Sequence, residues 1–401
     1  MKILVLNCGS SSIKYKLFDM SSQEVIASGG IEKIGLKGSF LKFKAPNGEK
    51  KIIEKDIPEH TVGVELVLQT LTDPNDGAIK SLDEINAVGH RMVHGGEKFT
   101  ESALLTPEVL EAFEACNDLA PLHNPANLKG VNAVKAILPE VPQVGVFDTA
   151  FHQTMPDYAY LYALPLEYYE KYQIRRYGFH GTSHRFVTRH VCEVLGTAPE
   201  GKKIITCHIG NGASIAAIKD GRVIDTSMGL TPLEGLVMGT RCGDVDGGVV
   251  TFLQNKLGVD ANEMSDILNK KSGMLGLTGI SSDMRSIEEA YKNKDPKAVT
   301  ATNVYTYRIK KYIGAYAAAL NGVDIIVFTG GVGENQANIR SEALADMDYL
   351  GVKIDNALNE ETRLGKEGVI STPDSKVKVV ILCTDEELMI AQDTVNILNG
   401  K

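Results

Sequence analysis

The chain has 401 residues and a net charge of −9, with 43% hydrophobic and 23% charged residues. This composition is that of a globular protein, and the length suggests roughly two or three domains. The acidic balance argues against a nucleic-acid partner. No apolar run approaches the ~20 residues needed to span a bilayer, so no membrane partner is expected. Six cysteines lie far apart without a CxxC pair, which argues against a zinc cluster or disulfide scaffold and predicts reduced thiols in a cytoplasmic protein.

The first predicted element is a β-hairpin at "KILVLNCGSSSIKYKLFD" (residues 2–19), where an apolar run enters a Gly-Ser turn and alternating residues leave it. The same plan recurs half a chain length later at "KIITCHIGNGASIAAIKD" (residues 203–220). Lys, Ile, Gly and Asp coincide in an alignment without gaps. This repeat predicts two domains built on one plan, and the Asp-Gly turn at Lys219–Arg222 predicts a further hairpin in the second copy.

Other segments read as strands alternating with helices. Strands are predicted within residues 144–151, 323–335 and 377–387. Helices are predicted after the Asp295-Pro296 cap, over Thr106–Ala120, and from a Thr384 cap with Glu387 as its capping-box acid. Together with the hairpins, this pattern predicts a mixed α/β protein.

Three glycine-containing turns follow predicted strands, at "NCGSSS" (7–12), "HIGNGAS" (208–214) and "TGGVGEN" (329–335). Backbone N–H groups that converge on such a turn bind phosphate. A single turn of this kind is more simply structural, because hairpin turns are often rich in glycine. Three at strand ends favour phosphate binding, although neither a Walker motif nor a GxGxxG turn after a strand is present.

Two arginines stand in glycine-rich segments, Arg91 in "GHRMVHGGEKF" and Arg241 in "TRCGDVDGG". For each, an ordinary surface arginine is the alternative. A guanidinium group binds carboxylate or phosphoryl oxygens through its bidentate fork. A pair of them therefore suits an anionic substrate on which charge develops during reaction.

Several carboxylates and histidines have two interpretations. Asp148, in "FDTAFH", is either a cap for the segment that follows it or an acid/base or metal-orienting group. His180, in "YGFHGTSH", suits donation to a phosphoryl oxygen, whereas His184 with Ser183 is predicted only to cap a helix starting near Arg185.

His123, in "APLHNPAN", is open to a structural or a functional role. Glu386 is explained by the preference of helix N-termini for acids.

These segments together resemble the signature motifs of the acetate kinases, the acetokinase family of the acetate and sugar kinase, Hsp70 and actin superfamily. "LVLNCGSSSIKY", "GHRMVHGG", "FDTAFH", "YGFHGTSH", "CHIGNGAS", "DTSMGLTPLEG", "MGTRCGD", "FTGGVGEN" and "TDEE" occur in order from residue 4 to residue 387. The resemblance implies an α/β fold of two duplicated actin-like ATPase (ribonuclease H-like) domains with mixed sheets and hairpins. The implied domains are residues 1–150 plus 386–401 and residues 151–385, with the active site in the cleft between them.

For activity, the resemblance implies reversible in-line transfer of the ATP γ-phosphoryl group to acetate, giving acetyl phosphate and ADP. The implied metal is Mg²⁺, with Mn²⁺ as a substitute, and the implied assembly is a homodimer. The alternatives are a propionate or butyrate kinase and, from a different class, a non-metabolic ATPase related to actin or Hsp70.

The resemblance also implies residue roles. The catalytic positions are Asp148, Arg91, His180 and Arg241. The substrate-binding positions are Arg91, Val93, Leu122, His123, Phe179 and Pro232. The nucleotide-binding positions are Lys14, His208, Ile209, Gly210, Asn211, Gly212, Asp283, Met284, Arg285, Gly331, Val332, Gly333, Glu334 and Asn335. The metal positions are Asn7 and Glu386.

A carboxylate acceptor has a pKa of about 4–5 and is already ionised at neutral pH. Asp148 is therefore expected to orient Arg91 and the metal shell, and not to remove a proton from acetate.

Overall fold

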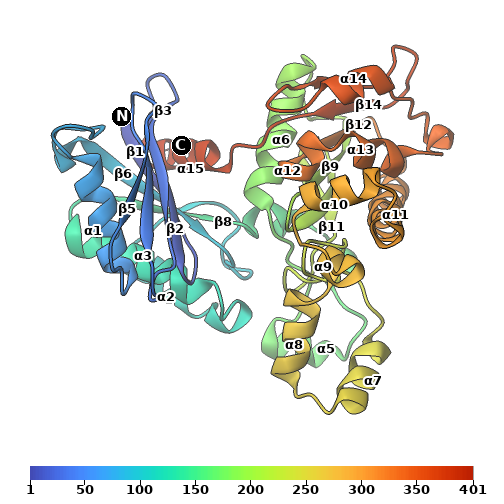
Figure 1. Ribbon diagram of the computed structural model, residues 1–401, viewed down its shortest axis with the longest axis horizontal. Coiled ribbons are helices and arrows are strands. Elements are labelled where there is room, and N and C mark those ends of the chain that lie inside the picture. The colour runs from blue at the N-terminus through green and yellow to red at the C-terminus, as the bar shows by residue number, and fades with distance from the viewer. Residues whose placement is uncertain (401) are drawn as a thin grey trace. The chain divides into compact units, whose positions relative to one another are not determined.

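The computed structural model describes residues 1–400 of the chain, and they form two compact units (Figure 1). The first unit contains Met1–Ala150 together with the C-terminal segment from Asp385, and the second contains Phe151–Thr384. Each unit is built around one β-sheet with helices against its faces. No helix within residues 1–400 combines the length and apolar composition of a membrane span.

The sheet of the first unit has eight strands in the spatial order β5-β4-β3-β2-β1-β6-β8-β7. These strands are β1 (Lys2–Cys8), β2 (Ser12–Asp19), β3 (Glu24–Glu32), β4 (Phe40–Lys44), β5 (Lys50–Glu54), β6 (Ile85–Met92), β7 (Ala103–Leu104) and β8 (Gln143–Phe147). β1 and β2 form the predicted N-terminal hairpin, whereas β1, β6 and β8 run parallel. The helical elements are α1 (His60–Leu71), η1 (Leu82–Glu84), α2 (Pro107–Glu114), η2 (Asn117–Leu119), α3 (Asn124–Ile137) and α15 (Glu386–Leu398).

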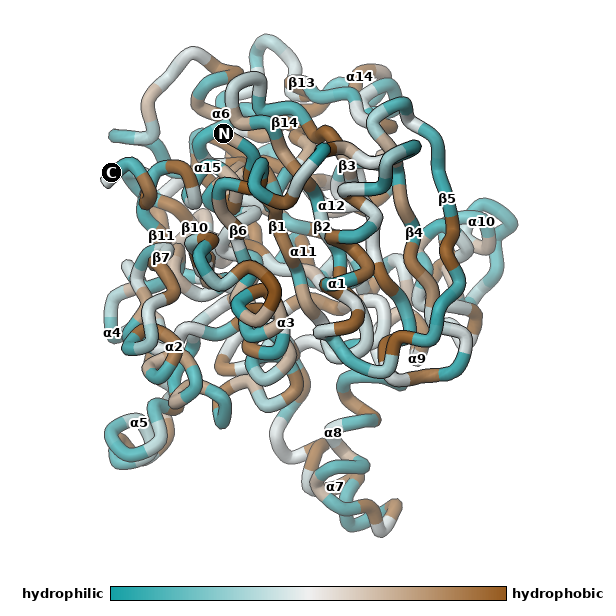
Figure 2. Tube along the Cα trace, turned by 90° about the vertical axis from the view of Figure 1, so that its left-hand side faces the viewer, coloured by the Kyte–Doolittle hydropathy of each residue, from teal (hydrophilic) through white to brown (hydrophobic). Residues whose placement is uncertain are grey.

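Alternate residues of β1 face two hydrophobic cores. Leu4 and Leu6 pack with residues of α1 and α3, whereas Ile3 and Val5 pack with Ile390 of α15. Figure 2 shows the hydrophobic residues gathered along β1 and α1, and Figure 1 shows α15, in red, beside this sheet. Because side chains alternate along a strand, the polar residues near the ends of β1, β6 and β8 are sorted between these two faces.

The sheet of the second unit repeats the plan. Its order is β11-β10-β9-β12-β14-β13, which matches β3-β2-β1-β6-β8-β7 of the first sheet in both position and strand direction. Its strands are β9 (Lys203–Ile209), β10 (Ala213–Lys219), β11 (Arg222–Thr226), β12 (Ile325–Thr329), β13 (Gly368–Val369) and β14 (Lys378–Ile381). The predicted duplication is therefore confirmed.

Helices also cover both faces of the second sheet. The helical elements are η3 (Ala150–Thr154), α4 (Asp157–Tyr160), α5 (Leu166–Tyr172), α6 (Gly181–Val194), α7 (Gly247–Leu257), α8 (Ala261–Lys270), α9 (Gly273–Thr278), α10 (Met284–Lys292), α11 (Pro296–Ala319), α12 (Gly330–Asn335), α13 (Ala337–Leu344), η4 (Asp348–Leu350) and α14 (Asn356–Glu361). Val187 and Val191 of α6 pack against Ile204 and Ala216 on one face. α11 contacts β9 and β10.

Two local predictions are confirmed by the chain's own hydrogen bonds. Asp295 caps α11, its carboxylate accepting the N–H groups of Lys297 and Ala298. The Asp-Gly turn joins β10 to β11, with Asp220 and Gly221 both at positive φ as a two-residue hairpin turn requires.

Two predicted helix limits are wrong. The last helix is capped by Asp385, whose carboxylate accepts the N–H of Leu388, while the hydroxyl of Thr384 lies 2.8 Å from that of Ser183. The helix predicted over Thr106–Ala120 ends at Glu114 and is followed by a turn and the short η2. Asn and Asp compete with a helical backbone for hydrogen bonds, which accounts for the break before the Asn-Asp pair.

Candidate active site

Polar residues gather at the carboxyl ends of the parallel strands of the first sheet. By alternation, Asn7 of β1, Arg91 of β6 and Asp148, just after β8, lie on the face covered by α15. Lys14 stands opposite Asn7 in the hairpin. Glu386 opens α15, and Arg91, Asp148 and Lys14 all act electrostatically on its carboxylate. The first unit thus brings together these five residues, which the sequence assigns to different roles.

Arg91 and Asp148 form a side-on ion pair. The Nε of Arg91 lies 3.0 Å from Oδ1 of Asp148 and its Nη2 lies 2.7 Å from Oδ2. Asp148 is 1% exposed and Arg91 is 25% exposed, so the carboxylate is buried behind the guanidinium group. The Asp148 charge outweighs burial and raises the pKa of Arg91. Nη1 forms no hydrogen bond within residues 1–400, which leaves one edge of a fixed cation for an anion.

Glu386 is a carboxylate in an environment that disfavours its charge. Burial raises the pKa of Glu386 to about 7, and although Arg91 opposes this shift, the charges of Asp148 and Glu387 add to it. The acids on either side of Glu386 are held differently, because Lys16 of β2 forms ion pairs of 3.2 Å with both Asp385 and Glu387. A partly buried carboxylate beside other carboxylates is stabilised in its charged form by a neighbouring cation.

The predicted substrate-binding residues differ in their exposure to solvent. Val93 follows β6 directly and is buried. Leu122 is 73% exposed, and His123 is exposed immediately before α3. In the second unit, Phe179 is buried and Pro232 accepts a hydrogen bond through its carbonyl oxygen.

His180 is held in an uncommon backbone conformation at the start of α6. Its φ is +58°, in the left-handed region that few residues other than glycine adopt. Its Nδ1 lies 2.9 Å from the hydroxyl of Ser214, and its ring stacks on His208 with centroids 4.2 Å apart. Non-glycine residues in this region cluster at functional sites, and these two contacts fix the orientation of the imidazole.

The prediction that His184 only caps a helix starting near Arg185 is wrong, because α6 begins at Gly181. His184 lies in its first turn and points into the sheet. Its Nδ1 is 2.7 Å from the hydroxyl of Thr206 and its Nε2 is 2.8 Å from that of Ser214. Burial lowers the pKa of His184 well below its usual value, so the ring is neutral. Its role is to hold Ser214, which the sequence analysis did not single out.

Arg241 and His180 converge over Gly212. A Cβ on Gly212 would lie 3.4 Å from both Nη2 of Arg241 and Nε2 of His180. The Nη1 of Arg241 donates to the carbonyl of Pro232 at 2.7 Å, and Arg241 forms no ion pair within residues 1–400. Burial lowers the pKa of Arg241, and a half-buried guanidinium group without a carboxylate partner is suited to an anionic ligand.

The second and third glycine-rich turns lie side by side. A Cβ on Gly210 would lie 3.9 Å from Nε2 of His208 and 4.0 Å from the backbone N of Gly331. Gly330 has a φ of +79°. Glu334 accepts the N–H of Gly330 at 2.8 Å, so its carboxylate braces the turn. Glycine at position 210 therefore keeps open a small space faced by an imidazole and a backbone N–H.

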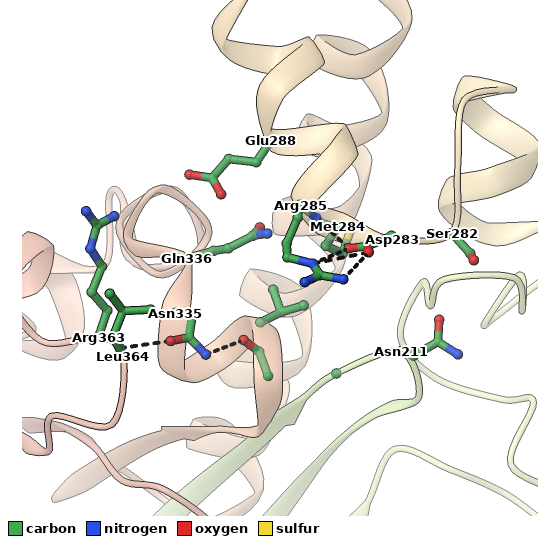
Figure 3. A pocket seen from close by; sticks show the side chains of 13 residues that line it. Asn211, Ser282, Asp283, Met284, Arg285, Glu288, Asn335, Gln336, Arg363 and Leu364 are labelled. Atoms are coloured by element: carbon green, nitrogen blue, oxygen red, sulfur yellow. Dashed lines mark hydrogen bonds and ion pairs between the residues drawn. The ribbon is translucent and has the colours of Figure 1, made fainter. Parts of the chain in front are cut away.

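A cavity of about 760 Å³ opens beside these turns (Figure 3). Eight predicted nucleotide residues line it: Gly210, Asn211, Asp283, Met284, Arg285, Gly331, Val332 and Asn335. His208, Ile209, Gly212, Gly333 and Glu334 are not among its lining residues, and Lys14 belongs to the first unit. Its volume lies within the ~300–1,000 Å³ typical of small-molecule sites.

Five further lining residues were not found from the sequence: Ser282, Glu288, Gln336, Arg363 and Leu364. Figure 3 shows Asn335 between two backbone partners, donating to the carbonyl of Gly331 and accepting the N–H of Leu364, both at 2.9 Å. Arg285 pairs side-on with Asp283 at the other wall. The spacing of residues 363 and 364 from the glycine-rich turns gives no local signal of this contact.

The buried guanidinium group of Arg340 ties two of these walls together. Its Nη1 donates to the carbonyls of Gly333 and Glu334, both at 2.9 Å, and its Nη2 donates to the carbonyl of Thr362 at 3.0 Å. Arg340 thereby holds the residues just before Arg363 against α12.

Comparison with known proteins identifies the family of the chain. The model of the acetokinase family matches residues 2–392. The acetate kinase of Phocaeicola vulgatus is 72% identical over 399 residues, which cover 100% of both chains. The crystal structure of Porphyromonas gingivalis acetate kinase has a TM-score of 0.96 at 59% identity and covers 99% of each chain. That of a propionate kinase from Francisella tularensis has a TM-score of 0.91 at 41% identity and covers 98% of each.

These matches extend over nearly the whole chain in sequence and in fold. They bear out the resemblance of the motifs and support the acetate kinases above the alternative families. The chain is therefore a phosphotransferase of the acetokinase family.

Proposed function

We propose that the chain catalyses reversible, magnesium-dependent transfer of the γ-phosphoryl group of ATP to acetate, giving acetyl phosphate and ADP. The observation that carries the proposal is the Arg91–Asp148 pair, in which a buried carboxylate fixes a guanidinium group and leaves one edge unbonded. That edge suits the carboxylate of a small acid. The relatives named acetate kinase support acetate as that acid.

In this proposal Arg91 binds and orients the acetate, and Asp148 orients Arg91. Acetate is ionised at neutral pH, so its oxygen attacks without a general base. Val93, buried beside this strand end, limits the apolar part of the acceptor. Leu122, His123, Phe179 and Pro232 stay proposed substrate-binding residues.

The nucleotide is assigned to the second unit. Its base and ribose would occupy the cavity between Asp283–Arg285 and Gly331–Asn335, and its phosphates the turns at Gly210 and Gly331. Arg241 and His180 would donate to the equatorial oxygens of the transferring phosphoryl group, because both side chains face the space above Gly212. Phosphoryl transfer depends mainly on such positioning and charge stabilisation.

Asn7 and Glu386 fit a magnesium ion, since both offer oxygen atoms and burial of Glu386 beside Asp148 favours a nearby cation. Residues 1–400 contain no cluster of three or more His, Cys, Asp or Glu side chains that could hold a metal. This agrees with the way Mg²⁺ is usually bound, through one or two carboxylates, water and substrate phosphates. Bound Mg²⁺ would neutralise phosphate charge, and Lys14 would add a further cation.

We also propose a cytoplasmic homodimer. Helix α7 has no buried residue, yet it exposes Val249, Phe252 and Leu257. Exposed apolar side chains on one helix are typical of an interface. The cytoplasmic location is supported by the six cysteines, which are all free thiols.

The test is an acceptor assay with purified protein, ATP and Mg²⁺, in which hydroxylamine traps the acyl phosphate. Acetate is expected to give a higher kcat/KM than propionate or butyrate. A higher value for a longer acid would overturn acetate as the acceptor, and the absence of any acyl hydroxamate would overturn the acyl-kinase activity. Sedimentation with ATP adds a check on the actin-like alternative, which predicts polymer.

Substituting Arg91 tests the role assigned to the Arg91–Asp148 pair. Arg91→Ala is expected to lower kcat/KM for acetate. The loss should correspond to about 2–4 kcal/mol of transition-state stabilisation, the usual contribution of a bidentate charge-assisted contact in an active site. Arg285→Ala, which removes an exposed arginine of the second unit, is the contrast and is expected to change the KM for ATP more than that for acetate. Unchanged KM and kcat for acetate in Arg91→Ala would overturn the assignment.

A further inference from the structure

Asn127, in the first turn of α3, joins the ends of two strands of the first sheet. Its Oδ1 accepts the N–H of Val93 at 3.0 Å and its Nδ2 donates to the carbonyl of Cys8 at 2.9 Å. The residue is 3% exposed, so water does not compete for these bonds. One amide therefore bonds to the residue after Asn7 and to the second residue after Arg91.

The two strand ends need such a link because their own pairing stops earlier. The last parallel pair of β1 and β6 is Leu6 with His90. Beyond it, the backbone of Cys8 and that of Val93 meet through the side chain of Asn127. A primary amide has a donor and an acceptor, as a peptide group does, so Asn127 extends the strand pairing by one step.

A glycine one turn after Asn127 allows α3 to lie close to β1. A Cβ on Gly130 would lie 2.4 Å from the Sγ of Cys8, a distance that real structures do not show. Glycine lets α3 approach β1 closely enough for Asn127 to reach the carbonyl of Cys8. Asn124, fully buried one turn earlier, bonds to both the N–H and the carbonyl of His94.

We propose that Asn127 is a positioning residue for phosphoryl transfer, which fixes the end of β1 that carries Asn7 relative to the end of β6 that carries Arg91. The inference rests on the proposed function. Asn127 lies under the sheet, on the face opposite α15, so it acts through the backbone and does not touch substrate. Displacements of about 1 Å between reacting groups cost up to ~100-fold in rate.

The test compares Asn127→Asp with Asn132→Asp. Both changes put a carboxylate on α3, but Asn132 is exposed and serves as the matched control. In Asn127→Asp the carboxylate still accepts from Val93, whereas its second oxygen faces the carbonyl of Cys8 without a proton to donate. We expect kcat/KM for acetate to fall about 10- to 100-fold, with ADP affinity by calorimetry changed much less, because the nucleotide cavity belongs to the second unit. Asn132→Asp is expected to match the unmodified chain in both.

Gly130→Ala provides a second variant that should give the same acetate-specific loss, by pressing α3 away from Cys8. Hydrogen exchange of the peptide containing Val93 should be faster in both variants and unchanged in Asn132→Asp. Unchanged acetate kinetics, equal losses for acetate and ADP, or failure of both variants to fold would each overturn the positioning role. If the unmodified chain makes no acetyl phosphate, the proposed function fails first, and the two failures are thereby distinguished.

Discussion

The carboxylate of Asp148 occupies one complete edge of the guanidinium group of Arg91, with Oδ1 3.0 Å from Nε and Oδ2 2.7 Å from Nη2. Asp148 also donates its backbone N–H to the carbonyl of Met92 at 2.9 Å. The residue is thus tied to β6 through both its main chain and its side chain. In the proposed function this position orients Arg91, and an acceptor that is already ionised needs no proton transfer from Asp148.

Asp148→Asn is expected to lower kcat/KM for acetate by about two orders of magnitude. The amide has similar size, but it turns an N–H group toward Arg91 and removes the charge that holds it. Steady-state kinetics at saturating Mg²⁺ measure the effect. Turnover close to that of the unmodified chain would show that Asp148 is not essential, either for Arg91 or for the metal.

Arg241→Ala is expected to lower kcat more than it raises either KM. The guanidinium group lies beside His180 over Gly212 and lacks a carboxylate partner within residues 1–400, so its charge is available for the transition state. An interaction made mainly in the transition state appears in kcat. A change confined to KM with kcat preserved would instead assign Arg241 to ground-state binding.

Gly212→Ala is expected to lower kcat about tenfold while the protein stays folded, because the added methyl group enters the space that Arg241 and His180 share. Gly247→Ala is the matched control, since a Cβ there meets no atom within 4 Å. Kinetics and thermal melting of both variants make the comparison. Equal activity in the two would mean that the phosphoryl group does not occupy the space above Gly212.

Stability is expected to fall below neutral pH because of His90. This residue is buried with Nε2 2.7 Å from Oε1 of Gln143, and burial lowers the pKa of His90 from 6.5 to about 4. In the unfolded chain this histidine binds a proton below pH 6.5, whereas in the folded chain it does so only below about pH 4. The free energy of unfolding therefore falls as the pH falls from 6.5 to about 4. Between pH 7 and pH 5, His90 is expected to lower the free energy of unfolding by about 2 kcal/mol.

Urea denaturation at pH 7 and pH 5 measures this loss, with His90→Asn as the variant without the titrating group. The variant should lose less stability than the unmodified chain over the same interval. An equal loss in both proteins would show that other groups set the acid sensitivity.

Local signals sufficed for much of the fold and part of the site. The repeat of residues 2–19 at residues 203–220 revealed the duplication. Arg91 and Asp148 were singled out at the ends of predicted strands, and His180 in a glycine-rich loop. For each of these residues, the polar side chain and the strand end or turn beside it lie in one short segment of the sequence. The site roles themselves stay predictions until the variants are measured.

Long-range contacts account for what the sequence analysis missed. His184 was taken for a cap because its partners, Thr206 and Ser214, stand 22 and 30 residues away on strands that only the fold brings to α6. Leu364 lines the cavity of Figure 3, where its N–H bonds to Asn335, 29 residues earlier. No periodicity or turn chemistry encodes such pairs.

The alignment of the two hairpins without a gap was wrong after the turn. Four residues separate the paired Cys8 and Ile13, and three separate Ile209 and Ala213. The coincidence of Asp19 with Asp220 is therefore one of spacing and not of structural position.

With the shorter second turn taken into account, Asn7 and Lys14 of the first hairpin correspond to His208 and Ser214 of the second, one step before the last pair in each. An amide and an ammonium group thus stand where the other copy places an imidazole and a hydroxyl. The first pair suits direct binding of a cation and a phosphate, whereas the second holds His180 from two sides. In the proposed function, the same position of a duplicated hairpin therefore binds ligand in the first unit and orients the side chain of His180 in the second.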